Sequence, residues 1–171
     1  MGRRNYLIEG GSGTGKTAVC HELRRRGYHA INGDRELAYQ GDPGTGEPVL
    51  GVTGVAAHRH HLWRVADVRA LAADRQHAVT FFCGGSRNLA EFVDVFDAVF
   101  VLEVDLHTLD RRLNRRPKDE WGGRQEERQL IEHLHETREE IPPGGIAIDA
   151  TVPLPHVVDT ILQHVRAAGS A

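Results

Sequence analysis

A glycine-rich segment near the N-terminus constrains this chain more than any other feature. Residues 10–17 read Gly-Gly-Ser-Gly-Thr-Gly-Lys-Thr and fit GxxxxGK[ST], the pattern of the phosphate-binding P-loop. A short apolar run at 5–9 precedes the segment and a helical pattern at 16–26 follows it. Strand, loop and helix in this order are the context that the motif requires. The segment therefore predicts a site for a nucleoside triphosphate with Mg²⁺.

Each position of this loop has a predicted task. Backbone N–H groups wrap around the phosphates, and side chains at the glycine positions would block that approach. The following helix directs its unpaired N–H groups toward the same anion. We expect Lys16 to bridge the outer phosphates as a catalytic residue and the Thr17 hydroxyl to bind the metal. The predicted nucleotide-binding residues of the loop are Gly10, Gly11, Ser12, Gly13, Thr14, Gly15, Lys16 and Thr17.

The use of lysine makes a chance match improbable. The chain has 21 basic residues, and only Lys16 and Lys118 among them are lysines. One of these two lysines stands at the position where a P-loop requires lysine, so the match supports a genuine P-loop.

Composition excludes several classes of protein. The chain of 171 residues, 40% hydrophobic and 26% charged, is typical of one globular domain, which we place at 1–171. It has no apolar run near the ~20 residues of a membrane span, and its first strand follows Arg4 directly, so we expect a cytoplasmic protein with no membrane partner. The net charge of −3 does not favour nucleic acid as a partner. Cys20 and Cys83 match no metal or disulfide pattern and are predicted core residues.

Apolar strand-like runs alternate with helical patterns along the whole chain. Because these runs are apolar on both faces, they predict an α/β fold with a parallel sheet and helices on both faces. The glycine- and proline-rich residues 41–48 are predicted to form a loop. The predicted strands are 5–9, 28–33, 78–83, 98–104 and 145–148, and the predicted helices are 16–26, 55–74, 88–96, 106–116, 125–140 and a last one around 157–165.

The chain lacks the marks of two other classes of P-loop protein. A regulatory GTPase needs an NKxD motif, which is absent, and the DxxG match at 119–122 lies too far from the P-loop. ATP-driven machines usually end a central strand in an acidic pair. Here the third strand ends at Cys83, and Asp105 after the fourth is better explained as the cap of the next helix.

The order of these landmarks resembles the small P-loop kinases of the shikimate, gluconate, nucleoside and nucleotide kinase group, and most closely its nucleoside kinases. An aspartate ends the second strand, a Gly-Gly turn and an arginine follow the third, and an arginine-rich segment follows the fourth. The resemblance implies a single-domain P-loop NTPase fold with strand order 2-3-1-4-5 and an Arg-rich lid at about 111–128. It also implies an adenine-side loop that includes Ala150 and Pro153.

Residues after the second and third strands are the predicted acceptor side. Asp34 would face the crevice at the carboxyl end of the sheet, where it could accept a proton as a catalytic base or hold Mg²⁺ through water; the alternative is a helix N-cap. A Gly-Gly turn would let substrate approach the backbone, and Arg87 could bind an anionic or hydroxyl-rich acceptor; the alternative for Arg87 is a surface ion pair. The predicted substrate residues are Asp34, Arg35, Gly84, Gly85 and Arg87.

The helix at 106–116 carries a cluster of arginines that lacks an anion. Its leucines form one apolar stripe, and the arginines form like-charge pairs at i, i+4 that disfavour the helix unless a phosphate balances them. A solvated surface is the alternative. We predict lid arginines here, with Arg111 and Arg115 as catalytic residues and 118–124 as a hinged tip; the four arginines of the cluster are Arg111, Arg112, Arg115 and Arg116.

The histidines at 58, 60 and 61 have three interpretations. An ordinary helix surface is the simplest, a lining of the acceptor pocket together with Trp63 is the second, and a metal site is the third. The mixed charges of 126–140 indicate a solvated helix.

These features together predict an ATP-dependent phosphotransferase that acts on a small-molecule acceptor, for which a nucleoside is favoured. The alternatives are a non-catalytic protein that binds ATP and a small molecule such as an antibiotic, and an ATPase.

Overall fold

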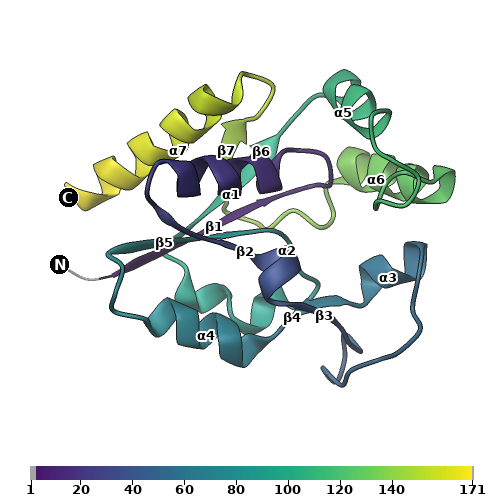
Figure 1. Ribbon diagram of the computed structural model, residues 1–171, viewed down its shortest axis with the longest axis horizontal. Coiled ribbons are helices and arrows are strands. Elements are labelled where there is room, and N and C mark those ends of the chain that lie inside the picture. Colours follow the sequence, from purple (N-terminus) through teal and green to yellow (C-terminus); the bar gives the residue numbers. More distant parts are fainter. Residues whose placement is uncertain (1–2, 171) are drawn as a thin grey trace.

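Five parallel strands form the centre of the computed structural model, which describes residues 3–170 (Figure 1). The predicted bounds 1–171 include residues 1, 2 and 171, which lie outside the described part. The sheet order is β2-β5-β1-β6-β7, which is the predicted 2-3-1-4-5, so the predicted fold class is confirmed. The strands are β1 (Arg4–Gly10), β2 (His29–Asn32), β5 (Val79–Cys83), β6 (Ala98–Glu103) and β7 (Ile146–Asp149).

Helices cover both faces of this sheet, and alternate residues of β1 show why. Tyr6 and Ile8 pack into one buried cluster with α1 (Lys16–Arg25) and α7 (Leu154–Gly169), while Leu7 packs into a second. The second cluster includes residues of α4 (Val65–Ala73) and of two 3₁₀ turns, Leu89–Glu91 and Val93–Val95. Figure 1 accordingly shows α1 and α7 above the sheet and α4 below it. A strand apolar on both faces therefore fits its central position.

The remaining helices lie beyond the carboxyl ends of the strands. These are α5 (Leu106–Leu113) and α6 (Gln125–Thr137), with the short α2 (Gly33–Glu36) and α3 (Val55–Arg59) opposite them (Figure 1). Asp105 caps α5 as predicted, because its Oδ1 accepts from the Thr108 N–H at 2.6 Å. Within residues 3–170, none of the helices combines the length and the apolar character that a membrane span requires.

The predicted helix at 55–74 is wrong in its middle. Residues between α3 and α4 form a short strand, β4 (His61–Trp63), which pairs with β3 (Ala38–Gln40) in antiparallel register. Leu62 and Trp63 are each 1% exposed, so adjacent apolar residues bury their side chains on opposite sides of a strand. Burial of the tryptophan therefore decides against a continuous helix.

Two other predicted elements also differ in detail. The second strand ends at Asn32, so Asp34 lies in the one-turn helix α2 rather than at a strand end. The predicted helix at 125–140 is not solvated all round, since Ile131 is 4% exposed and belongs to the core. The buried face is difficult to recognise from the sequence because few residues of this helix are apolar.

Trp63 packs closely against Gly33 and so constrains the backbone next to Asp34. A Cβ atom at Gly33 would lie 2.1 Å from Cζ2 and 2.4 Å from Cη2 of the indole. The indole is stacked on Phe92, with ring centroids 5.8 Å apart, and has no free space to move into.

We therefore expect Gly33→Ala to lower the free energy of unfolding by about 1–3 kcal/mol, the usual cost of overpacking. Chemical denaturation measures the change. Gly11→Ala is the matched control, because a Cβ atom there meets no atom within 4 Å. Equal stability of Gly33→Ala and the wild type would show that Trp63 does not constrain this turn.

Candidate functional site

Two cavities meet at the P-loop. The outer groove has a volume of about 700 Å³ and the inner cavity about 370 Å³. Lys16 and Asp34 line both of them. The outer groove also includes Thr17, Arg35, Arg112, Arg116, Ala150 and Val152, and the inner cavity includes Glu9, His58, His61, Gly85, Arg87, Val101, Val104, Leu134 and Glu140.

The P-loop has the backbone geometry that its glycines predict. Gly10, Gly13 and Gly15 have φ angles of 152°, 85° and 106°, which favour glycine. A Cβ atom at Gly10 would also lie 2.7 Å from Thr14 Oγ1 and 2.9 Å from the Leu102 carbonyl oxygen. Lys16 Nζ donates to the carbonyl oxygens of Gly10 and Gly11, so its cation is held inside the loop.

Asp34 stands where three donors converge on one oxygen. Its Oδ1 accepts from His61 Nε2 at 2.9 Å, from the Gly85 N–H at 3.3 Å and from Trp63 Nε1 at 3.4 Å. Burial raises the pKa of this carboxyl, but the hydrogen bond from His61 and the charge of Lys16 oppose burial and bring the pKa below its usual value. Asp34 is therefore an ionised carboxylate between the two cavities.

Glu9 is a site residue that the sequence interpretation missed. It is the penultimate residue of β1, is 5% exposed and lines the inner cavity. Its Oε1 accepts from the Gly10 N–H at 3.0 Å. Burial is the main reason that its pKa rises to about 7, against the opposing charge of Lys16. An acidic residue at the end of an otherwise apolar strand was the available signal, since a charge there is costly unless it is used.

The Gly-Gly turn after β5 accommodates these two carboxyl groups. A Cβ atom at Gly84 would lie 2.6 Å from Asp34 Oδ1, and one at Gly85 would lie 2.5 Å from Glu9 Oε1. The turn was predicted to admit a substrate. In the structure its lack of side chains admits the protein's own carboxylates, and only Gly85 of the pair lines the inner cavity.

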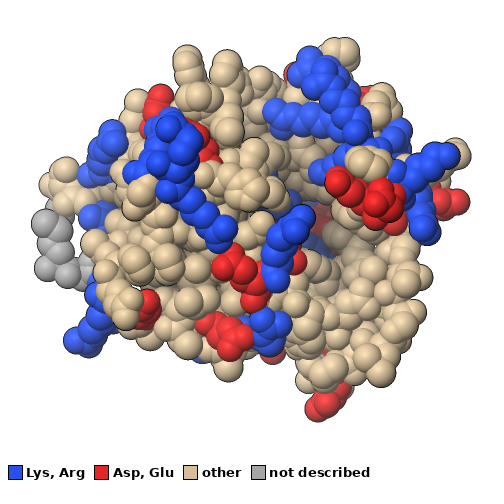
Figure 2. Space-filling view, viewed as in Figure 1, with Lys and Arg blue, Asp and Glu red and all other residues tan. Residues whose placement is uncertain are grey.

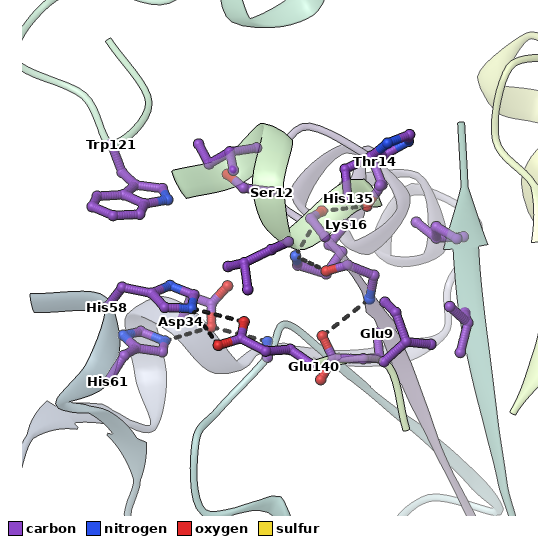
Figure 3. A pocket seen from close by; sticks show the side chains of 18 of the residues that line it. Glu9, Ser12, Thr14, Lys16, Asp34, His58, His61, Trp121, His135 and Glu140 are labelled. Carbon is purple, nitrogen blue, oxygen red and sulfur yellow. Dashed lines mark hydrogen bonds and ion pairs between the residues drawn. The ribbon is translucent and has the colours of Figure 1, made fainter. Parts of the chain in front are cut away.

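A second polar cluster closes the inner cavity opposite Asp34. Arg87 forms an ion pair with Glu140, which also accepts from His58 Nε2 at 2.8 Å. The His58 ring stacks on Trp121, with centroids 5.6 Å apart and planes 9° from parallel. Burial raises the pKa of Glu140, but His58 and Arg87 outweigh it and hold that pKa below the usual value. Figure 3 shows His58, His61 and Glu140 directed toward the same space.

The arginines that reach the P-loop are not the pair that was named from the sequence. Arg112 donates to the carbonyl oxygens of Gly13 (3.1 Å) and Thr14 (3.0 Å), and Arg116 donates to Ser12 Oγ at 3.0 Å. Burial lowers the pKa of both guanidinium groups.

Arg111 and Arg115 are instead exposed and line neither cavity. Helical geometry gives the reason. Within α5, Arg112 at i+3 from Leu109 lies about 60° from the buried stripe, whereas Arg111 at i+2 lies on the opposite side. Figure 2 shows basic side chains gathered at the α5 end of the molecule.

The other predicted residues are divided between the two cavities and the surface. Arg35 and Ala150 line the outer groove, whereas Pro153 is the exposed N-cap of α7 and lines neither cavity. The histidines at 58 and 61 line the inner cavity rather than a helix surface, but Trp63 is buried beneath Asp34. Among residues 3–170, no three His, Cys, Asp or Glu side chains are grouped to hold a metal ion.

Comparisons with known proteins agree with this architecture. No family model matches the chain, and no curated protein is similar to it in sequence. Among solved structures, shikimate kinase from Acinetobacter baumannii in complex with shikimate has a TM-score of 0.64 at 16% identity, over 97% of this chain and 94% of that one. A sugar kinase from Janibacter sp. has a TM-score of 0.56 at 18% identity, over 94% and 93%.

Deoxyadenosine kinase from M. mycoides with bound dATP is also similar, with a TM-score of 0.50 at 14% identity over 94% of this chain and 98% of that one. The chain therefore has the fold of the small P-loop kinases, as its landmarks predicted.

Glu9 provides a test of the site through stability. Its carboxyl has a reference pKa of 4.5 and a folded pKa of about 7, so between these values the folded state holds more protons than the unfolded state. The free energy of unfolding therefore loses up to about 3 kcal/mol from this group as the pH rises through the interval.

Glutamine does not titrate, so Glu9→Gln lacks this loss. We therefore expect the difference in free energy of unfolding, Glu9→Gln minus wild type, to increase by up to about 3 kcal/mol between pH 4.5 and pH 8. Denaturation at a series of pH values measures the difference, and Glu126→Gln, at an exposed position in α6, is the control. Parallel pH profiles for Glu9→Gln and the wild type would contradict the assignment.

Proposed function

We propose that this protein transfers the γ-phosphoryl group of ATP to a hydroxyl group of a small molecule bound in the inner cavity. The observation that carries the proposal is that Lys16 and Asp34 line both cavities. A cation that can neutralise the transferred group and a carboxylate that can receive a proton thus stand where donor and acceptor would meet.

The outer groove suits the donor nucleotide. Its P-loop offers backbone N–H groups at the start of α1, and Arg112 and Arg116 add two positive charges beside them. The hydrogen bonds of both arginines go to carbonyl and hydroxyl oxygens, so their charges are available to phosphates. We assign ATP to this groove, with Ala150 at the adenine side.

Thr17 and Asp34 supply the oxygen donors that Mg²⁺ prefers, and both line the outer groove. In P-loop enzymes this ion takes most of its ligands from phosphate and water, so two protein oxygens suffice. When bound, Mg²⁺ neutralises charge that develops on the transferred phosphoryl group.

The two carboxyl groups of the site have complementary protonation. Asp34, with a lowered pKa, is the carboxylate that accepts the proton of the attacking hydroxyl or holds a water on Mg²⁺. Glu9, with a pKa of about 7, is partly protonated at neutral pH and can donate a hydrogen bond to the acceptor. Opposed environments of this kind separate acid and base roles in active sites.

We further propose that residues 111–128 act as a lid over the nucleotide and that a nucleoside is the favoured acceptor. The lid proposal rests on three residues of this segment. Arg112 and Arg116 donate hydrogen bonds to the P-loop, and Trp121 lines both cavities. A volume of about 370 Å³ is that of a small-molecule pocket. The solved structures of this fold are named for sugar, shikimate and deoxyadenosine substrates, so the acceptor is best found by a screen.

The first test removes the P-loop cation. We expect Lys16→Met to lower acceptor-dependent ADP release by on the order of 100-fold or more, because a charge that stabilises the transition state is lost. A panel of nucleosides, sugars and aminoglycosides supplies the acceptors. Arg75→Met is the control, since it removes an exposed positive charge that lies outside both cavities and outside the proposed lid.

Two results would contradict the proposed transfer. ADP release that needs no acceptor would indicate an ATPase. Binding of ATP and an acceptor without turnover would indicate a protein that sequesters small molecules.

The second test separates the two faces of α5. We expect Arg112→Met to lower the turnover rate by on the order of 100-fold, because its guanidinium lies beside the P-loop. Arg111→Met removes the same charge from the exposed face and should change the rate by less than about threefold. If Arg111→Met were the more damaging change, the arginine named from the sequence would be the correct one and the lid would have to rotate on closure.

A further inference from the structure

The charges that line the inner cavity are balanced before any ligand enters. Its lysine and arginine side chains are Lys16, Arg87 and Arg138, and Lys16 belongs to the P-loop. The other two are each held by a carboxylate, Arg87 by Glu140 and Arg138 by Glu103.

Four carboxyl groups line the same cavity, namely Glu9, Asp34, Glu103 and Glu140. Because Glu9 is partly protonated at neutral pH, the carboxylates roughly equal these cations in number. A carboxylate or phosphate on the acceptor would add an uncompensated charge in a partly buried space, where such a charge is costly. To reach a cation on the acceptor side, it would first have to displace Glu140 from Arg87 and leave that carboxylate buried without its partner.

One wall of the cavity is apolar. Side chains from β6, α6 and the residues that follow each of them form this wall, and the stacked pair His58 and Trp121 adds flat aromatic surface. Such a wall favours the uncharged ring of a ligand over a charged group. The members of the wall are Val101, Leu102, Val104, Ile131, Leu134 and Ile141.

We infer that the inner cavity selects acceptors that carry no negative charge, as uncharged ring-bearing hydroxyl compounds do, and that Glu140 enforces this choice by neutralising Arg87. The inference rests on the proposed function only in that it calls the ligand an acceptor. The selection against negative charge applies to any ligand of the inner cavity. Acceptors with a carboxylate or phosphate are excluded, and Glu140 is a specificity residue that takes no part in the transfer.

Inorganic phosphate is a probe of this selection that needs no knowledge of the acceptor. The P-loop is first saturated with Mg²⁺ and a non-hydrolysable ATP analogue, so that the remaining anion site is the inner cavity. Titration calorimetry then compares the wild type with Glu140→Gln. We expect phosphate to bind Glu140→Gln at least about 10-fold more tightly, because a desolvated arginine beside a neutral amide attracts an anion.

Two further variants make the result specific. Glu139→Gln removes the same charge from the neighbouring exposed residue, whose contact is with His133 at 3.7 Å, and should leave phosphate binding as in the wild type. Adding Arg87→Met to Glu140→Gln should abolish the gain. Equal gains in Glu139→Gln and Glu140→Gln would overturn the inference.

The wild type alone also decides the matter if Glu140→Gln does not fold. Phosphate binding by the wild type that Arg87→Met removes would overturn the inference, and its absence would support it. The binding experiment does not depend on the transfer assay, so its result can be interpreted even if no transfer is observed. Conversely, Arg87-dependent phosphate binding by the wild type would end the selection by charge and leave the proposed transfer standing.

Discussion

Backbone hydrogen bonds from β1 to both β5 and β6 set the position of the P-loop and of the Gly-Gly turn. Ile8 is paired with Cys83 on one side, and Gly10 is paired with Leu102 on the other. Because all three strands run in the same direction, their carboxyl ends meet at one edge of the sheet. The P-loop therefore leaves β1 beside the Gly-Gly turn of β5 and beside the apolar wall that follows β6.

Two carboxyl groups within this turn have opposite properties, although both are buried to some degree. Asp34 receives three hydrogen bonds on one oxygen, one of them from His61, and its pKa falls. Glu9 receives a single backbone N–H and is almost completely enclosed, so its pKa rises. Local donors and exposure, rather than residue type, thus distinguish the two. Both groups depend on the absence of Cβ atoms at Gly84 and Gly85.

Contacts across the inner cavity join segments that are far apart in the chain. Glu140, which follows α6, contacts both α3 and the segment after β5, and Trp121 stacks on α3 from the proposed lid. These residues all line the inner cavity. This arrangement also assigns Arg87 a partner within the protein, which changes the expected acceptor from an anion to an uncharged compound.

The sequence by itself determined the five strands, the P-loop and the presence of Asp34, because strand patterns and a glycine-rich phosphate loop are local properties of the chain. The strand order followed only from the resemblance to the small P-loop kinases. The sequence also contained the information that separates Arg112 from Arg111, since helical spacing alone divides the two faces of α5. Only the tertiary structure decided that Trp63 lies in strand β4 in the middle of the helix predicted at 55–74, that Glu140 neutralises Arg87 and that burial raises the pKa of Glu9. These features depend on contacts between residues up to 82 positions apart, and such contacts exist only after the sheet has brought its loops together.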